Sequence, residues 1–353
     1  MLALGASGKV YSWGENQHGQ LGRTAIGHVD WHPGEVENLP VIVQVAAGEN
    51  FALALDDTGR VHAWGYAANG ALGNVPPTSA FRQIPAPIPG LFNIAKVAAG
   101  RHHAVALSND GHIYTWGAGT YGALGHGDLA DRDQPRSVFI ADTVVTDIAA
   151  GDSYTLFLGN GNFVGGFGLN DSFQLGDAVA SGGYEPWPVA IAISLVGLDH
   201  VFAGVSTGFV VNGFGELLAW GANYGCIKGY CSAAAPDLEQ VSGISDVAMV
   251  GASYSHALVL DGAQGAVYGV GANFQGQLGL PNDTAYNGPE QVPLTGSVTH
   301  VSTGTLYSAL VMDGAVHVAG RNAYGEQARA PLMPIPFPVM VDAPSVAVSY
   351  LGD

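Results

Sequence analysis

Short runs in which apolar residues alternate with small or polar ones recur along the chain, and most of them end in glycine. Examples are Val10–Gly14, Val61–Gly65, Ile113–Gly117 and Leu217–Gly221. A period of two, carried by β-branched and aromatic residues between glycines, indicates strands. No long stretch follows the 3.6-residue period of a helix. The pattern therefore predicts an all-β protein.

These runs form a repeat with an almost constant period. When the glycine that ends each run is used as a marker, successive copies lie 49 to 53 residues apart. The seven marker glycines are Gly14, Gly65, Gly117, Gly168, Gly221, Gly271 and Gly320. An upstream motif glycine also recurs, at Gly48, Gly100, Gly151, Gly204, Gly251 and Gly304. Each copy has room for about four short strands, so the sequence predicts a seven-bladed β-propeller with about four antiparallel strands per blade.

The two ends of the chain predict how the ring closes. The first copy lacks the upstream motif, and the last residues lack a strand after them. We expect Val346–Gly352 to share a blade with Leu2–Leu4, because this pairing removes exposed sheet edges. Residues 1–353 are therefore expected to form a single β-propeller domain of seven repeats.

Composition and charge narrow the possible partners. The 353 residues include 52 glycines, which fits turns that need positive φ. Eleven lysines and arginines stand against 29 aspartates and glutamates, a formal net charge of −18. Nucleic-acid binding needs a cationic face, so we expect neither direct nucleic-acid binding nor attachment to anionic membranes. No segment approaches the ~20 apolar residues of a membrane span, and Met1–Gly5 lacks the features of a signal peptide.

Several side chains suggest chemistry, and each has a structural explanation. Large aromatics at one repeat position are typical of packing between blades; they are Trp13, Trp64, Trp116 and Trp220. His28, Asp30 and His32 have a spacing that a metal could use, but no partner ligand is evident, so a solvent-facing loop is favoured and no metal is expected. No nucleophile elbow, phosphate loop or dinucleotide fingerprint precedes a helix, so we expect no catalytic residues and no cofactor.

The two cysteines, Cys226 and Cys231, lie in one loop with four residues between them. They can form a local disulfide if the loop turns back, or remain two thiols in a reducing compartment. The compartment is therefore undetermined, with a slight preference for a secreted or surface-exposed location.

The chain resembles the regulator of chromosome condensation repeat family. The resemblance rests on the spaced motifs 98–107, Gly111–Gly117 and Tyr121–Asp128, and it extends over essentially the whole chain. It implies a seven-bladed propeller with a binding role. One member exchanges nucleotide on a small GTPase through polar residues, such as Asp and His, just after the repeat glycine. Here His102 matches that pattern and no aspartate does. A light-sensing member has tryptophan directly after this glycine, and this chain has none there.

These observations lead to one favoured hypothesis and two alternatives. We expect a non-catalytic propeller that binds a protein partner through one ring face, as a monomeric ring or within a larger assembly. The residues expected at this face follow the repeat glycines and are Glu49, Asn50, Arg101, His102, Asp152, Tyr154, Tyr254 and Tyr307. Tyrosine, arginine and acidic side chains together suit a protein interface. The alternatives are a guanine-nucleotide exchange factor for a small GTPase and a structural component of a larger particle.

Overall fold

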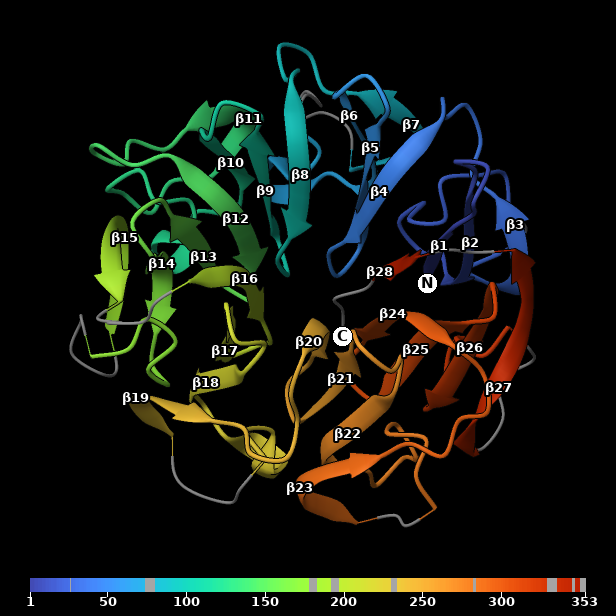
Figure 1. The fold of residues 1–353 in the computed structure, drawn as a ribbon. Coiled ribbons are helices and arrows are strands. Elements are labelled where there is room, and N and C mark those ends of the chain that lie inside the picture. Colours follow the sequence, from blue (N-terminus) through green and yellow to red (C-terminus); the bar gives the residue numbers. More distant parts are fainter. Residues whose placement is uncertain are drawn as a thin grey trace.

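The computed structural model describes residues 1–25, 27–73, 80–177, 183–191, 197–229, 234–281, 284–328, 335–344 and 347–349. Its strands form seven four-stranded antiparallel sheets arranged as blades around a central axis (Figure 1). The predicted fold class, an all-β seven-bladed propeller, is confirmed.

The strands are given from the innermost to the outermost of each blade. Blade 1 contains β28 (Ala347–Ser349), β1 (Leu2–Leu4), β2 (Val10–Glu15) and β3 (Val29–Glu35). Blade 2 contains β4 (Ile42–Ala47), β5 (Phe51–Asp56), β6 (Val61–Tyr66) and β7 (Phe81–Pro87). Blade 3 contains β8 (Ile94–Ala99), β9 (His103–Ser108), β10 (Ile113–Gly117) and β11 (Arg132–Ser137). Blade 4 contains β12 (Val145–Ala150), β13 (Tyr154–Gly159), β14 (Phe163–Asn170) and β15 (Gly183–Ile191).

The remaining blades follow the same order. Blade 5 contains β16 (Leu198–Ala203), β17 (Thr207–Asn212), β18 (Leu217–Gly221) and β19 (Ala235–Gln240). Blade 6 contains β20 (Val247–Ala252), β21 (His256–Asp261), β22 (Val267–Ala272) and β23 (Ala285–Gln291). Blade 7 contains β24 (Val298–Thr303), β25 (Tyr307–Met312), β26 (Ala315–Gly320) and β27 (Ile335–Pro344). The described residues also form three single-turn 3₁₀ helices, η1 (Ala68–Gly70), η2 (Thr120–Gly122) and η3 (Tyr224–Cys226).

The innermost strands surround the axis and fix the orientation of every blade. Neighbouring members of the series β28, β4, β8, β12, β16, β20 and β24 lie against each other, and β24 also contacts β28 (Figure 1). β28 pairs with β1 in antiparallel register, with Leu2 opposite Ser349. Of the segment expected to close the ring, Val346 and residues 350–352 lie outside the described residues.

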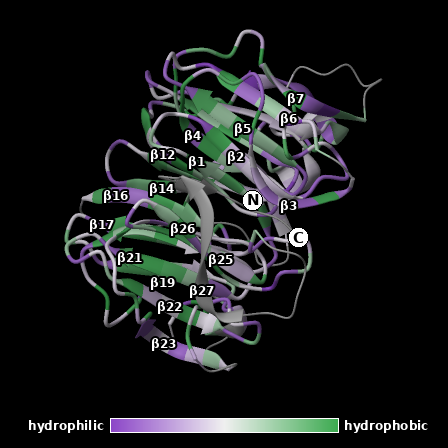
Figure 2. Cartoon of the chain, turned by 90° about the vertical axis from the view of Figure 1, so that its right-hand side faces the viewer, coloured by the Kyte–Doolittle hydropathy of each residue, from purple (hydrophilic) through white to green (hydrophobic). Residues whose placement is uncertain are grey.

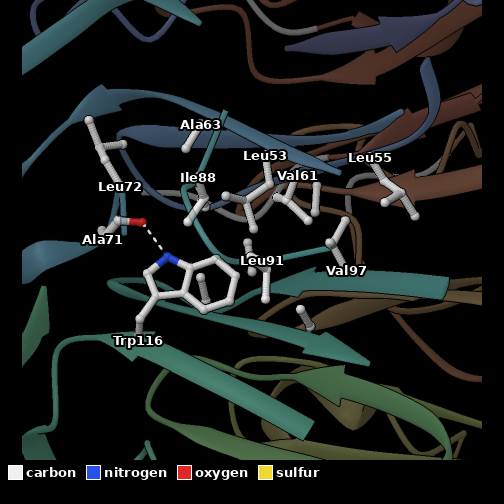
Figure 3. Close-up of a cluster of buried hydrophobic side chains, with 14 of the residues drawn as sticks. Leu53, Leu55, Val61, Ala63, Ala71, Leu72, Ile88, Leu91, Val97 and Trp116 are labelled. Carbon is white, nitrogen blue, oxygen red and sulfur yellow. Dashed lines mark hydrogen bonds between the residues drawn. The ribbon is translucent and has the colours of Figure 1, made fainter. Parts of the chain in front are cut away.

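The hydrophobic core lies between blades, as the tryptophan positions predicted. Trp13, Trp64, Trp116 and Trp220 have no exposed surface. Each indole N–H donates to a backbone carbonyl of the neighbouring blade at 2.8 to 2.9 Å, and the Trp116 bond to Ala71 is drawn in Figure 3. Each tryptophan thus buries a large apolar area and also satisfies its polar atom. These side chains form the scaffold and are unavailable to a partner.

The glycine after each tryptophan position is required by backbone geometry. The seven marker glycines have φ between 90° and 111°, a region that residues with a Cβ rarely adopt. Gly117 also lies opposite His103, and a Cβ there would meet the carbonyl oxygen of His102 at 2.6 Å. The strand ladder is irregular at this point, as in a β-bulge.

Hydropathy follows the blade structure. In Figure 2 most strands are coloured hydrophobic, whereas hydrophilic residues gather in loops and on outer strands such as β7 and β23. In the described part of the chain, no helix has the length and apolar character needed to cross a membrane.

Candidate partner-binding surface

The turns from the innermost to the second strand of each blade form a rim at one end of the central channel. We define the rim as residues 48–50, 100–102, 151–153, 204–206, 253–255 and 304–306. Backbone hydrogen bonds join successive turns: Glu49 donates to Arg101, Arg101 to Asp152, Asp152 to Val205, and Val205 to Ser253, at 3.0 to 3.3 Å. Because these bonds join the turns of blades 2 to 6 in series, side chains from different blades are held side by side.

The third residue after each rim glycine points away from this surface. Tyr154 was expected to contact a partner, but it has no exposed surface, and its hydroxyl lies 2.9 Å from the carbonyl oxygens of Gly204 and Thr207. Tyr307 is also buried. The expectation for both tyrosines is wrong, because this position opens the second strand opposite the marker glycine and its side chain enters the core. A Cβ at Gly151 would overlap the Tyr154 ring, which explains the rim glycine.

Blade 6 departs from the repeat, which changes the position of Tyr254. Gly251 lies within β20, so the rim position belongs to Ser253. The Ser253 N–H donates to the carbonyl of the third residue after it, His256, which is the bond that the rim glycines make in other blades. The Ser253 hydroxyl contacts the His256 ring at 2.7 Å. Tyr254 is consequently the first residue after the rim position, and it is 45% exposed. The predicted frame of this copy was wrong by two residues, but Tyr254 does lie at the surface.

Charged residues on the rim form a cluster that spans blades 2, 3 and 4. The Arg101 guanidinium donates to Glu49 at 2.8 Å and lies 3.8 Å from an Asp152 oxygen. The His102 ring lies 3.2 Å from the second Glu49 oxygen. The side chains of Arg101 and His102 are 45% and 43% exposed. Surface ion pairs contribute only about 0 to 1 kcal/mol to stability, so the cluster mainly orders groups that remain accessible.

Two further rim contacts complete the surface. The Asn50 side-chain oxygen accepts from Gln20 at 3.2 Å. On blades 5 and 6, the rings of Tyr224 and Tyr254 are stacked with centroids 4.6 Å apart, and both are nearly half exposed. Sequence reasoning missed Gln20 and Tyr224, because both lie on the long third-to-fourth-strand loops and approach the rim only in the folded ring. Their loops carry no motif at those positions that marks them as rim neighbours.

The central channel holds a cavity of about 180 Å³ between the innermost strands of blades 2 to 6. Polar side chains at one repeated position bridge neighbouring blades there. Gln44 exchanges two hydrogen bonds with the Val97 backbone, and Asp147 accepts from Lys96 and from the Val201 N–H. Burial by itself would raise the pKa of Asp147, but hydrogen bonds from His200 and Lys96 hold that pKa below its usual value. These groups connect blades, and they include no nucleophile poised on a base.

The remaining candidate groups stand as follows. Cys226 is disulfide-bonded, whereas Cys231 lies outside the described residues, so their pairing stays a prediction. Asp30 pairs with Arg23 at 2.9 Å and with His32 at 3.2 Å. Among the residues that the structure describes, no group of three or more His, Cys, Asp or Glu is arranged to hold a metal ion.

A seven-bladed ring with glycine-based rim turns defines a class of repeat propeller, and comparison with known proteins identifies the family. The family model for the RCC1-like domain matches residues 1–231. The model for the regulator of chromosome condensation (RCC1) repeat matches residues 264–311. The chain belongs to the RCC1 repeat family, as the motifs of the sequence indicated.

Similar proteins differ in how much of their length matches. The regulator of chromosome condensation of Mus musculus is 31% identical over 346 residues, which cover 88% of this chain and 80% of the mouse protein. Protein RCC2 of Homo sapiens is 32% identical over 252 residues, covering 63% of this chain and 48% of RCC2, so the match spans about half of that protein. The structure of Prp20p from Saccharomyces cerevisiae has a TM-score of 0.83 at 20% identity and covers 97% of this chain and 88% of Prp20p, a likeness of fold.

Proposed function

We propose that this propeller binds a protein partner through the rim and acts without catalysis of its own. The observation that carries the proposal is that the ordered Glu49–Arg101–Asp152 cluster and the exposed Tyr224–Tyr254 pair lie on the same rim. Exposed tyrosine and arginine side chains are the types that dominate protein interfaces. The ion pairs and ring stacking restrict these side chains before binding, which reduces the entropy lost when a partner docks.

The rim proposal is tested with the triple variant Arg101→Ala, His102→Ala and Tyr254→Ala. Tyr154 stays intact because its removal would damage the core. The matched control is Arg60→Ala, His112→Ala and Tyr184→Ala, which deletes the same exposed side-chain types elsewhere. Partners captured by the unmodified protein from cell extract are identified by mass spectrometry and titrated against both variants. We expect at least tenfold weaker binding for the rim variant alone. Equal affinity of the rim variant and the unmodified protein would exclude the rim as the interface.

A second candidate function is nucleotide exchange on a small GTPase. Family membership and the accessible His102 on the rim favour it. The Prp20p structure is described together with binding of that protein to Gsp1p and histones. Release of a fluorescent guanine nucleotide from a panel of small GTPases measures this activity directly. Acceleration at micromolar propeller, lost in the rim variant, supports exchange. Binding of a GTPase without faster release supports the binding function alone.

A further inference from the structure

The opposite end of the ring presents a second surface, which we call the hairpin face. It consists of the hairpins between the second and third strands and of the turns that enter each innermost strand. Strand direction alternates within a blade, so these segments lie at the channel end away from the rim. Backbone bonds hold the two kinds of segment together: Asp57 donates to Val41, Asn109 to Asn93, and Asn160 to Val144, at 2.9 to 3.1 Å.

Large apolar side chains are exposed on this face. Phe92, Phe139 and Phe214 are 69%, 81% and 75% exposed, and Val41 and Val144 are about half exposed. They belong to blades 2 to 5 and the connections between them. The turns need none of these rings: the corresponding turn of blade 6 has Ser245 before Asp246 and reaches β20 without an aromatic residue. Several large exposed aromatics on one face are typical of a binding surface.

Exposed aspartates occur in the same hairpins and entry turns as the aromatic residues, or directly beside those turns in the chain. The six on this face are Asp57, Asp110, Asp142, Asp199, Asp246 and Asp313. Within the described residues, none of the six pairs with a lysine or an arginine; the ion pair of Asp110 is with His112. Two exposed cations, Lys9 and Arg60, lie on the described hairpins, and Lys9 is already paired with Glu35 at 2.9 Å. The face therefore carries a local excess of unneutralised negative charge.

Turn geometry does not require this charge. Asp142 and Asp246 adopt left-handed φ values of 51° and 52°, a conformation that aspartate and asparagine both tolerate. Asn38 and Asn93 occupy the corresponding turns before β4 and β8 at φ values of 57° and 61°. Asparagine thus satisfies the turn without a charge, while Asp57 and Asp199 have no such φ constraint.

We propose that the hairpin face docks a cationic polypeptide segment in which lysines or arginines alternate with apolar residues. Apolar partner residues cover the phenylalanines, and the basic residues lie beside the unpaired aspartates. Electrostatic complementarity of this kind speeds encounter and selects the partner. Nucleic acids and anionic membranes are repelled by the same charges. A second copy of this chain brings another formal charge of −18 and is disfavoured.

The test uses a fluorescein-labelled 16-residue peptide of alternating lysine and leucine, with binding followed by anisotropy in 50 and 300 mM salt. Variant A is Phe92→Ser, Phe139→Ser and Phe214→Ser. Variant B is Asp57→Asn, Asp142→Asn, Asp199→Asn and Asp246→Asn, which preserves the left-handed turns. The matched control carries four equal charge losses on exposed residues toward the rim end: Asp133→Asn, Asp171→Asn, Asp177→Asn and Asp237→Asn.

We expect variants A and B each to weaken peptide binding about tenfold, with a smaller salt effect for variant B. The control and the rim variant should bind within about twofold of the unmodified protein, which separates this inference from the proposed rim function. Equal weakening by variant B and the control would show non-specific attraction and overturn the proposal. Unchanged binding by variant A would overturn it as well, as would dimerisation of the unmodified protein that variant A abolishes.

Discussion

The two ends of the propeller use charge in opposite ways. At the rim, Arg101 lies between Glu49 and Asp152, and backbone hydrogen bonds join the turns of blades 2 to 6 in series. At the hairpin face, hairpins are also bonded to the next blade, as where the Ile94 N–H donates to Gly59 and the Val145 N–H donates to Gly111. Within the described residues, however, none of the six exposed aspartates of this face pairs with a lysine or an arginine. The same strand repeat builds both ends. Loops at both ends are bonded between blades, so the chemistry of each end is decided by the side chains that its loops carry.

The largest expected effect comes from removing the scaffold that both ends share. Trp116→Ala should lower the free energy of unfolding by about 3 to 5 kcal/mol, because it opens a cavity and loses the bond to Ala71. Chemical denaturation measures this loss. Trp187→Ala is the control, since that ring is 57% exposed, and it should cost less than about 1 kcal/mol. Equal destabilisation by both would contradict the assignment of Trp116 to the inter-blade core.

A comparable loss is expected where blades 3 to 5 are tied together in the channel. Asp147→Ala leaves Lys96 and the Val201 N–H without their buried acceptor, which should cost about 3 kcal/mol. Asp147→Asn retains part of the hydrogen bonding and should cost less. Thermal unfolding of the two variants checks this order. If Asp147→Asn proves the more damaging variant, the hydrogen-bonding role assigned to the carboxylate is wrong.

Acid should lower the free energy of unfolding through two buried histidines near the rim. Burial lowers the pKa of His103 to about 4 and that of His256 to about 3. The folded protein therefore binds these protons less readily than the unfolded chain, whose histidine pKa is near 6.5. Stability is fully present above pH 6.5 and declines as pH falls toward 4, by roughly 2 kcal/mol for His103 at pH 5. Denaturation as a function of pH measures the slope.

His103→Phe provides the matched variant for this pH dependence. Phenylalanine occupies the equivalent position in blade 2, at Phe51, so the ring should fit. Thr155 retains its bond to the Ala123 carbonyl. The stability of this variant should fall less steeply between pH 6.5 and 4. An unchanged slope would show that His103 titrates normally in the folded protein.

The smallest effect on stability is expected for the rim ion cluster. Arg101→Ala should change the free energy of unfolding by less than about 1 kcal/mol, because the Arg101 side chain is 45% exposed and water screens its pair with Glu49. A double-mutant cycle with Glu49→Gln, measured at low and high salt, isolates the pair. A coupling well above 1 kcal/mol would assign the cluster to stability and weaken its proposed role in binding.

Much of the fold followed from local rules that act on neighbouring residues. Alternating strands, marker glycines and repeated tryptophans each require a local geometry, and together they predicted seven blades and inter-blade packing. The site was harder to predict because it depends on side-chain direction. Tyr154 and Tyr254 both lie three residues after a glycine, yet Tyr154 is buried and Tyr254 is exposed. In blade 6 the rim position is Ser253, two residues after Gly251. Because Gly251 keeps nearly the repeat spacing, the sequence alone assigned the rim position to that glycine.

The sequence by itself determined the length of the repeat, the positions of the marker glycines and the acidic net charge. These properties belong to single residues or to one repeat. Only the tertiary structure decided which charges meet and which remain unpaired. Glu49, Arg101 and Asp152 are about fifty residues apart in the chain and become neighbours when blades 2 to 4 pack side by side. The stacking of Tyr224 on Tyr254 and the exposure of Phe92, Phe139 and Phe214 are likewise set by blade packing, since burial depends on what the rest of the ring covers.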